Sequence, residues 1–170
     1  MLDAKAGGYT VGVLVQCNYG RRDQLRIAGV PVGKEIPEHA PYSNDVGSII
    51  IVVATDAPLI PTQLKRVARK ASLGLGRDGS YSGDGSGDIF VAFSTANPGA
   101  AQAKGVRDLK MLPNDSLDPL FLATVQATEE AVVNAMVAAE TMTGIDGHTV
   151  IGLPHDRLRD ALKKYNRLEK

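Results

Sequence analysis

The sequence predicts a layered α/β fold, in which strands alternate along the chain with helices. Residues 49–55 and 89–95 are continuous apolar runs rich in β-branched and aromatic side chains, which suits strands covered on both faces. Between them, residues 61–76 repeat apolar positions at helical spacing. Strands interleaved with helices favour α/β layers over an all-α or all-β architecture.

The first element is a strand. Residues 9–17 alternate apolar and other side chains with a period of two, and the turn-prone triplet Asn18-Tyr19-Gly20 ends the run. Residues 25–30 predict a second short strand. A loop that contains several prolines and glycines then leads to Ser48.

The run at 49–55 follows Ser48 directly, and Asp56-Ala57-Pro58 ends it. A helix is expected from Pro61, with its apolar positions on one side and a basic cluster at 65–70 on the other. We expect this helix to stop at Gly74 or Gly76.

A glycine-rich loop then leads into the strand at 89–95. A long helix is predicted over 120–143, where only three side chains are charged, so we expect it to be buried on most sides. A short strand at 149–151 and an amphipathic helix at 155–165 complete the order of elements.

Composition narrows the function classes. The 170 residues fit one domain, and 19 basic residues balance 19 acidic ones, so net charge attracts the protein to neither nucleic acid nor an anionic membrane. Cys17 is the only cysteine, which excludes an internal disulfide and suits a reducing compartment. The N-terminus does not resemble a signal peptide, and the run 49–54 is far shorter than the ~20 residues that span a bilayer. We expect a soluble, cytoplasmic protein.

Neither a cofactor nor a metal is expected. The letters of Gly74-Leu-Gly-Arg-Asp-Gly79 match a dinucleotide fingerprint, but they follow a helix rather than a strand. The segment 84–88 resembles the start of a calcium loop, yet positions six and twelve hold Ile89 and Thr95 instead of Gly and Glu. The histidines His39, His148 and His155 are far apart in the sequence and are expected to be solvated.

Ser48 stands at the junction between a turn-like segment and the most apolar run of the chain. Gly and Ser are common loop residues before a buried strand, which is the plain explanation. The sharper hypothesis is that Ser48 is a nucleophile. Its own α-amine could act as the base once residues 1–47 were cleaved from it, since such an amine has a reference pKa of about 7.7–8.0. Gly47 can adopt strained backbone angles and leaves its carbonyl open to attack by the Ser48 hydroxyl.

Four segments together resemble a known family. They are VQCNYG, NDVGSIIIVVATDAPL, GDGSGDIFVAFSTAN and MLPNDSLDPLFLATVQATEEAVVNAM. In this order they closely resemble the self-processing L-aminopeptidase/D-amidase-esterases and β-peptidyl aminopeptidases, which are N-terminal-nucleophile hydrolases. The resemblance runs from about Gly8 to the end of the chain, and it implies a layered αββα sandwich.

The resemblance also implies roles for individual residues. Ser48 matches the nucleophile, freed by cleavage at Gly47-Ser48, and Asn18 matches an asparagine that helps form the oxyanion hole. Ser86 matches a second serine near the nucleophile, and Asp88 matches an acidic residue that orients this group. Without the resemblance, Asn18, Ser86 and Asp88 would be ordinary turn residues. The β-peptidyl members carry Glu where Asp88 stands, so amides of ordinary L-amino acids or short peptides are the expected substrates.

The family's precursors carry a longer segment before the nucleophile than the 47 residues found here. Residues 1–47 would then be the end of an α-chain-like segment, and 48–170 a β-chain-like segment, within one incomplete sandwich. We expect poor activity from this chain alone, exposed apolar edges such as that of residues 49–54, and homo-oligomers of processed αβ units in the complete protein. Two alternatives stay open: acyl transfer like that of ornithine acetyltransferases, whose threonine nucleophile argues against it, and an inactive fragment that binds a partner subunit.

Overall fold

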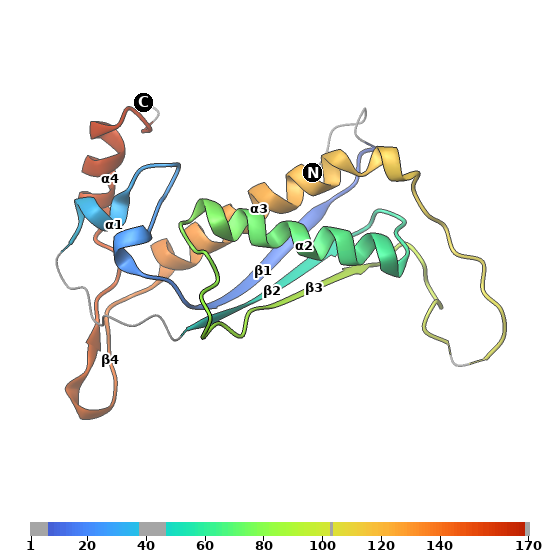
Figure 1. Ribbon diagram of the computed structural model, residues 1–170, viewed down its shortest axis with the longest axis horizontal. Helices are drawn as coiled ribbons and strands as arrows, with labels where there is room; N and C mark the ends of the chain where they lie inside the picture. The colour runs from blue at the N-terminus through green and yellow to red at the C-terminus, as the bar shows by residue number, and fades with distance from the viewer. Residues whose placement is uncertain (1–6, 38–46, 103, 169–170) are drawn as a thin grey trace.

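A three-stranded sheet and two helices laid across one of its faces form the body of the computed structural model (Figure 1). The structure describes residues 7–37, 47–102 and 104–168. The strands are β1 (Val11–Asn18), β2 (Ser48–Thr55) and β3 (Ile89–Ser94), and the two helices are α2 (Pro61–Arg77) and α3 (Asp118–Ala138). The layered α/β prediction is therefore confirmed.

β2 is the middle strand of the sheet. It runs antiparallel to β1, which places Asn18 opposite Ser48, and parallel to β3. The parallel pair is joined by α2, the helical crossover that parallel neighbours require. The expectation that residues 49–54 form an exposed edge is wrong, because the edges of this sheet are β1 and β3.

The hydrophobic core lies between the sheet and the two helices. Ile49, Ile51 and Val53 of β2 are buried on this side, because alternate residues of a strand point to the same face. α2 and α3 approach closely at Gly74, where a Cβ would lie 2.6 Å from both the Val125 carbonyl oxygen and the Thr128 Cβ. This close packing holds the two helices against each other in one layer.

The opposite face of the sheet is open and apolar. Its large exposed side chains are Leu14, Ile50, Ile89, Val91 and Phe93, and Leu14 is 72% exposed. Residues 49–55 and 89–95 were both expected to be covered on two faces, and this is wrong for the described residues. The apolar runs reflect a surface built to be buried, but nothing in the described part of the chain packs over it.

A smaller unit joins the first and last parts of the chain. It contains α1 (Val32–Glu35) and α4 (His155–Lys164), which share a second apolar cluster that includes Ile27, Val30 and Leu158. Glu35 accepts hydrogen bonds from Lys164 Nζ at 2.8 Å and from the Tyr165 hydroxyl at 2.9 Å. These contacts tie α4 to the segment that follows β1.

One predicted strand is absent, and the ends of both long helices differ from the predictions. Residues 25–30 form a tight turn rather than a strand, because Ala28 and Gly29 take positive φ values of 51° and 78° and leave only the isolated bridge from Ile27 to Val30. α2 continues past Gly74 and Gly76 to Arg77. α3 ends at Ala138, and the residues after it form the hairpin of β4 (Met142–Thr143) and β5 (Thr149–Val150), which projects from the body in Figure 1.

The other predicted elements are present. The strand expected at 149–151 is β5, and the helix expected at 155–165 is α4. Short 3₁₀ turns occupy Arg22–Gln24, Asn114–Ser116 and Ile145–Gly147. No helix in the described part of the chain is long and apolar enough to cross a membrane.

Candidate active site

Ser48 is the first residue of β2, at the end of the sheet where β1 finishes. Directly paired residues in an antiparallel ladder point to the same face, so Ser48 and its partner Asn18 share a face. Because Ile49, Ile51 and Val53 face the helices, this shared face is the open one. The predicted nucleophile and the predicted oxyanion residue therefore lie side by side on the uncovered surface.

Gly47 packs against the backbone of the Asn18-Tyr19 corner. A Cβ at residue 47 would overlap the Asn18 carbonyl oxygen, lie 2.7 Å from its carbonyl carbon and lie 2.8 Å from Tyr19 Cα. Only glycine fits so close to a neighbouring backbone. Gly47 is expected at the cleavage point for its conformational freedom, and the structure adds this steric reason. The preceding loop, residues 38–46, and His39 within it lie outside the described residues.

The hydroxyl of Ser48 is held by a backbone donor. The Gly87 N–H donates to Ser48 Oγ at 2.9 Å. Gly87 lies just before β3, in the loop whose serine and aspartate were predicted to belong to the site. Sequence reasoning missed this residue because a backbone N–H leaves no side-chain signal, although its place in the Gly-Ser-Gly-Asp segment was a hint.

Asp88 is the centre of a hydrogen-bond network behind Ser48. Its Oδ1 accepts the Ile49 N–H at 3.1 Å and the Ser86 hydroxyl at 2.5 Å, while its Oδ2 accepts the Ser82 hydroxyl at 2.8 Å. The bond to Ile49 fixes the backbone next to the nucleophile, so Asp88 links the start of β2 to the start of β3. Ser82 was not singled out from the sequence.

The structure thus brings Ser48, Asn18, Ser86 and Asp88 to one end of the sheet. The α-amine of Ser48 is still part of the peptide bond to Gly47 in this uncleaved chain. Chemically, the arrangement offers a hydroxyl with a fixed direction, a neighbouring amide side chain and an anchored carboxylate. These are the parts needed for acyl transfer.

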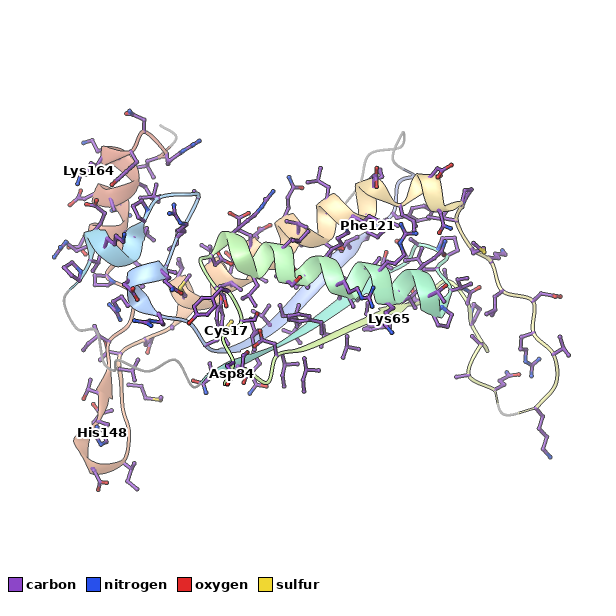
Figure 2. All side chains as sticks on the ribbon, in the orientation of Figure 1. Cys17, Lys65, Asp84, Phe121, His148 and Lys164 are labelled. Atoms are coloured by element: carbon purple, nitrogen blue, oxygen red, sulfur yellow. The ribbon has the colours of Figure 1, made fainter. Side chains whose placement is uncertain are left out.

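On the helix side of the same corner lies Tyr19, which is partly buried against the core. Burial, then the negative charges of Asp78, Cys17 and Asp88, raise the pKa of the Tyr19 phenol. The phenol therefore stays neutral and can donate a hydrogen bond throughout the physiological pH range. In Figure 2 the side chains of Cys17 and Asp84 mark this end of the sheet.

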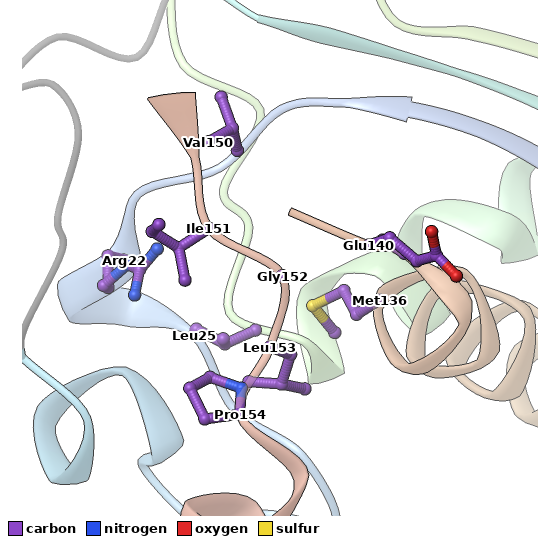
Figure 3. A pocket seen from close by; sticks show the side chains of 10 residues that line it. Arg22, Leu25, Met136, Glu140, Val150, Ile151, Gly152, Leu153 and Pro154 are labelled. Atoms are coloured by element: carbon purple, nitrogen blue, oxygen red, sulfur yellow. The ribbon is translucent and has the colours of Figure 1, made fainter. Parts of the chain in front are cut away.

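A separate apolar hollow of about 180 Å³ lies between the end of α3 and the segment before α4 (Figure 3). Leu25, Met136, Ile151 and Leu153 contribute to its lining. None of the four predicted site residues lines this hollow, so it is distinct from the end of the sheet that carries Ser48.

The motifs considered for cofactors have structural explanations. Gly74 and Gly76 lie inside α2, which places the fingerprint-like letters at the end of a helix. His155 is exposed, and its Nε2 lies 2.9 Å from the Val137 carbonyl oxygen. Within the residues described, no three His, Cys, Asp or Glu side chains gather closely enough to hold a metal ion.

Residues 1–150 match the family described as peptidase family S58. Two proteins named beta-peptidyl aminopeptidase BapA are similar to the chain. The one from Sphingosinicella microcystinivorans is 52% identical over 98% of this chain and 46% of its own length, and the one from Sphingosinicella xenopeptidilytica is 46% identical over 91% and 42%. The chain therefore spans less than half the length of these curated relatives.

Solved structures agree with this similarity. The L-aminopeptidase D-Ala-esterase/amidase of Ochrobactrum anthropi, described as a new variant of the Ntn hydrolase fold, superposes with a TM-score of 0.87 at 51% identity, covering 95% of this chain and 45% of the other. A beta-aminopeptidase from a Burkholderia species gives a TM-score of 0.85 at 47% identity, covering 96% and 46%. The described layers correspond to part of that fold.

Proposed function

Because the chain belongs to peptidase family S58, we propose that it is the nucleophile-bearing part of a self-processing serine aminopeptidase. Ser48 is the nucleophile, and Gly47-Ser48 is the bond that is cleaved. The observation that carries this proposal is the position of Ser48, whose Oγ is held by the Gly87 N–H while Gly47 is packed against the Asn18 carbonyl.

The proposed processing is an acyl shift from nitrogen to oxygen followed by hydrolysis. Ser48 Oγ attacks the Gly47 carbonyl carbon, the C–N bond breaks, and the hydroxyl proton passes to the nitrogen, which leaves an ester between Gly47 and Ser48. Water then hydrolyses the ester and frees the Ser48 amine. The Asn18 side-chain amide is suited to stabilise the oxyanion of the tetrahedral intermediate, a contribution that is ~3–4 kcal/mol for such a donor.

In the mature enzyme the freed amine takes the proton from Ser48 Oγ as the hydroxyl attacks the carbonyl of a substrate. The acyl group moves to Ser48, and the protonated leaving amine departs. Water then releases the acid. Asp88, with Ser86 and Ser82 bonded to it, keeps the start of β2 in position and supplies negative charge toward the substrate's ammonium group.

The proposed substrates are amides of L-amino acids and short peptides. Asp88 is one methylene shorter than the glutamate expected in β-peptidyl members, which argues against a preference for β-peptides. The similar proteins named for aminopeptidase activity support the general class of substrate. We further propose that the complete protein is a homo-oligomer of processed units. The match to a peptidase family gives no support to the alternative of acyl transfer like that of the ornithine acetyltransferases.

We propose that the rest of the site is built over the open face of the sheet. Ser48 and Asn18 point to this face, which is apolar and uncovered in the described residues. The chain also spans under half of the relatives' length. A second layer of polypeptide from outside this chain would bury the open face and supply the walls of the substrate pocket, so this chain alone should turn over substrate poorly.

The test is a chimaera that joins this chain to the part of the Sphingosinicella microcystinivorans relative outside the matched region. We expect a new chain beginning at Ser48 and hydrolysis of alanine p-nitroanilide. Ser48→Ala should abolish both, while Ser72→Ala, in an exposed serine of α2, should abolish neither. Full hydrolysis by the Ser48→Ala chimaera would contradict the mechanism, and a wild-type chimaera that folds but neither cleaves nor hydrolyses would favour the inactive fragment.

A further inference from the structure

Gly87 lies beside Ser48 because of the register of the parallel strands. β2 and β3 pair with Ile50 opposite Ile89. Continued two residues toward the start of both strands, the same register places Gly87 next to Ser48, and the hydrogen bond from the Gly87 N–H to Ser48 Oγ joins them at 2.9 Å. The sheet register, rather than a loop contact alone, thus sets the position of this donor.

The peptide unit of Gly87 is held from both sides. Its neighbours are Ser86 and Asp88, and the Ser86 hydroxyl donates to Asp88 Oδ1 at 2.5 Å. Asp88 Oδ1 also accepts the Ile49 N–H at 3.1 Å. Gly87 and Asp88 therefore each share a hydrogen bond with the start of β2, in opposite directions. A donor held in this way does not have to reorient when charge develops on its acceptor.

Space, rather than backbone conformation, explains the glycine at this position. The φ of Gly87 lies outside the left-handed region that favours glycine, unlike that of Gly79 at 101°. A Cβ at residue 87 would lie 3.3 Å from Ser48 Oγ, which is a crowded contact beside the atom that must attack. The missing side chain therefore keeps the surroundings of Ser48 Oγ open.

The N–H of Gly87 reaches the oxygen whose charge changes most during the proposed reaction. A hydroxyl oxygen that accepts one hydrogen bond keeps a second lone pair for attack. Ser48 Oγ carries negative charge after its proton has left and before the bond to the carbonyl carbon is complete, and again when the C–Oγ bond of the ester breaks. The charged oxygen accepts a stronger hydrogen bond than the neutral hydroxyl does. The donor therefore stabilises these transition states more than the ground state.

We propose that the backbone N–H of Gly87 is a catalytic donor to Ser48 Oγ, which acts when this oxygen attacks and again when it leaves the acyl carbon. In the second step the water oxygen bonds to the acyl carbon, the C–Oγ bond breaks, and a proton from the water returns to Oγ. This role differs from that of Asn18, which is proposed to stabilise the carbonyl oxygen. For catalysis the inference rests on the proposed function, whereas the hydrogen bond itself is present in the uncleaved chain.

Amide hydrogen exchange of the uncleaved chain tests the bond without any need for activity. Ser48→Ala removes the acceptor, so exchange of the Gly87 amide should become about two- to tenfold faster, the range for the loss of one hydrogen bond. Ser72→Ala is the matched control, because it removes a hydroxyl that bonds to the Arg69 carbonyl within α2, and it should leave the Gly87 amide unchanged. Equal exchange in Ser48→Ala and wild type would overturn the inference.

Exchange of one backbone amide for an ester in the chimaera tests the catalytic role. Gly87→glycolic acid replaces the N–H by an oxygen and adds no side chain. We expect the rate of cleavage at Gly47-Ser48, and kcat of the processed protein for alanine p-nitroanilide, to fall by about tenfold or more. KM should change little, because the lost interaction strengthens in the transition state. The same exchange at Gly83, whose N–H donates to none of the described residues, is the matched control and should alter neither rate.

Unchanged rates in the ester variant at residue 87 would overturn the inference, as would equal losses from the esters at 87 and 83. If the ester variant does not fold, Gly87→Ala decides, because its methyl group would push Ser48 Oγ away from the donor. Cleavage should then be slower, whereas Gly76→Ala, where a Cβ meets nothing within 4 Å, should cleave normally. Normal cleavage in Gly87→Ala would contradict the proposal. A wild-type chimaera without any activity would reject the proposed function, and the catalytic role with it, while faster exchange in Ser48→Ala would still confirm the hydrogen bond.

Discussion

Replacing Gly47 by alanine should break the contact on which cleavage depends. The new Cβ would overlap the Asn18 carbonyl oxygen and stand 2.8 Å from Tyr19 Cα. Carbon atoms pack best at about 3.5–4.0 Å, and the overlap with the Asn18 carbonyl oxygen is closer still, so the corner and the start of β2 must separate by more than an ångström. The obstructing atoms are backbone, which cannot turn aside as a side chain can. Overpacking of this kind costs about 1–3 kcal/mol of unfolding free energy.

Urea unfolding of Gly47→Ala and of wild type measures this cost. Gly12→Ala is the matched control, because Gly12 lies in the neighbouring strand β1 and a Cβ there meets nothing within 4 Å. It should be neutral or stabilising by up to about 1 kcal/mol. In the chimaera, Gly47→Ala should raise the free energy of the geometry from which Ser48 attacks by about 2 kcal/mol, which slows processing roughly thirtyfold. Equal stability of the two variants, with normal cleavage in Gly47→Ala, would refute the steric argument.

Four further predictions concern the Asp88 network, the core, the open face of the sheet and a buried carboxyl group. In Asp88→Asn one side-chain oxygen remains where the wild-type carboxylate accepts hydrogen bonds at both oxygens. The free energy of unfolding in urea should therefore fall by about 1–3 kcal/mol, and an unchanged value would show that the network is not stabilising. Ile51→Ala, at a fully buried position, should cost about 2–5 kcal/mol, whereas Leu14→Ser on the open face should cost less than about 0.5 kcal/mol and reduce self-association seen by light scattering. Asp78 is a buried residue just beyond the C-terminal end of α2, and burial, then Glu129, raise the pKa of its carboxyl to about 8. Between pH 4 and 8 the native state alone holds this proton, so the unfolding free energy of Asp78→Asn should exceed that of wild type by a margin that grows about 1.4 kcal/mol per pH unit. A constant margin in urea unfolding at several pH values would contradict this sign.

The sequence predicted elements correctly where the local residue pattern matched the way the element packs in the structure. The change at Ser48 from turn residues to an apolar run predicted the start of β2, and the helical spacing after Pro61 predicted α2. The end of α2 was misplaced because Gly74 serves close packing against α3 rather than termination. A glycine alone does not reveal which of these purposes it serves.

Long-range relations were harder to predict. A continuous apolar run shows that a strand favours burial, but it does not show what covers the strand, and Leu14 on the open face is uncovered by the described residues. The donor to Ser48 is the backbone of Gly87, which has no side chain to attract notice. Asp78 was noticed only as part of the rejected dinucleotide fingerprint, because its burial depends on how distant parts of the chain pack together.

The central claim is that Ser48 becomes the first residue of a processed chain and then attacks substrate. N-terminal sequencing and intact mass spectrometry of the purified chimaera test it most directly. We expect a cleaved product that begins Ser-Ile-Ile-Ile-Val, formed by wild type and absent from Ser48→Ala. An active chimaera that remains uncleaved, or one cleaved at another bond, would contradict it.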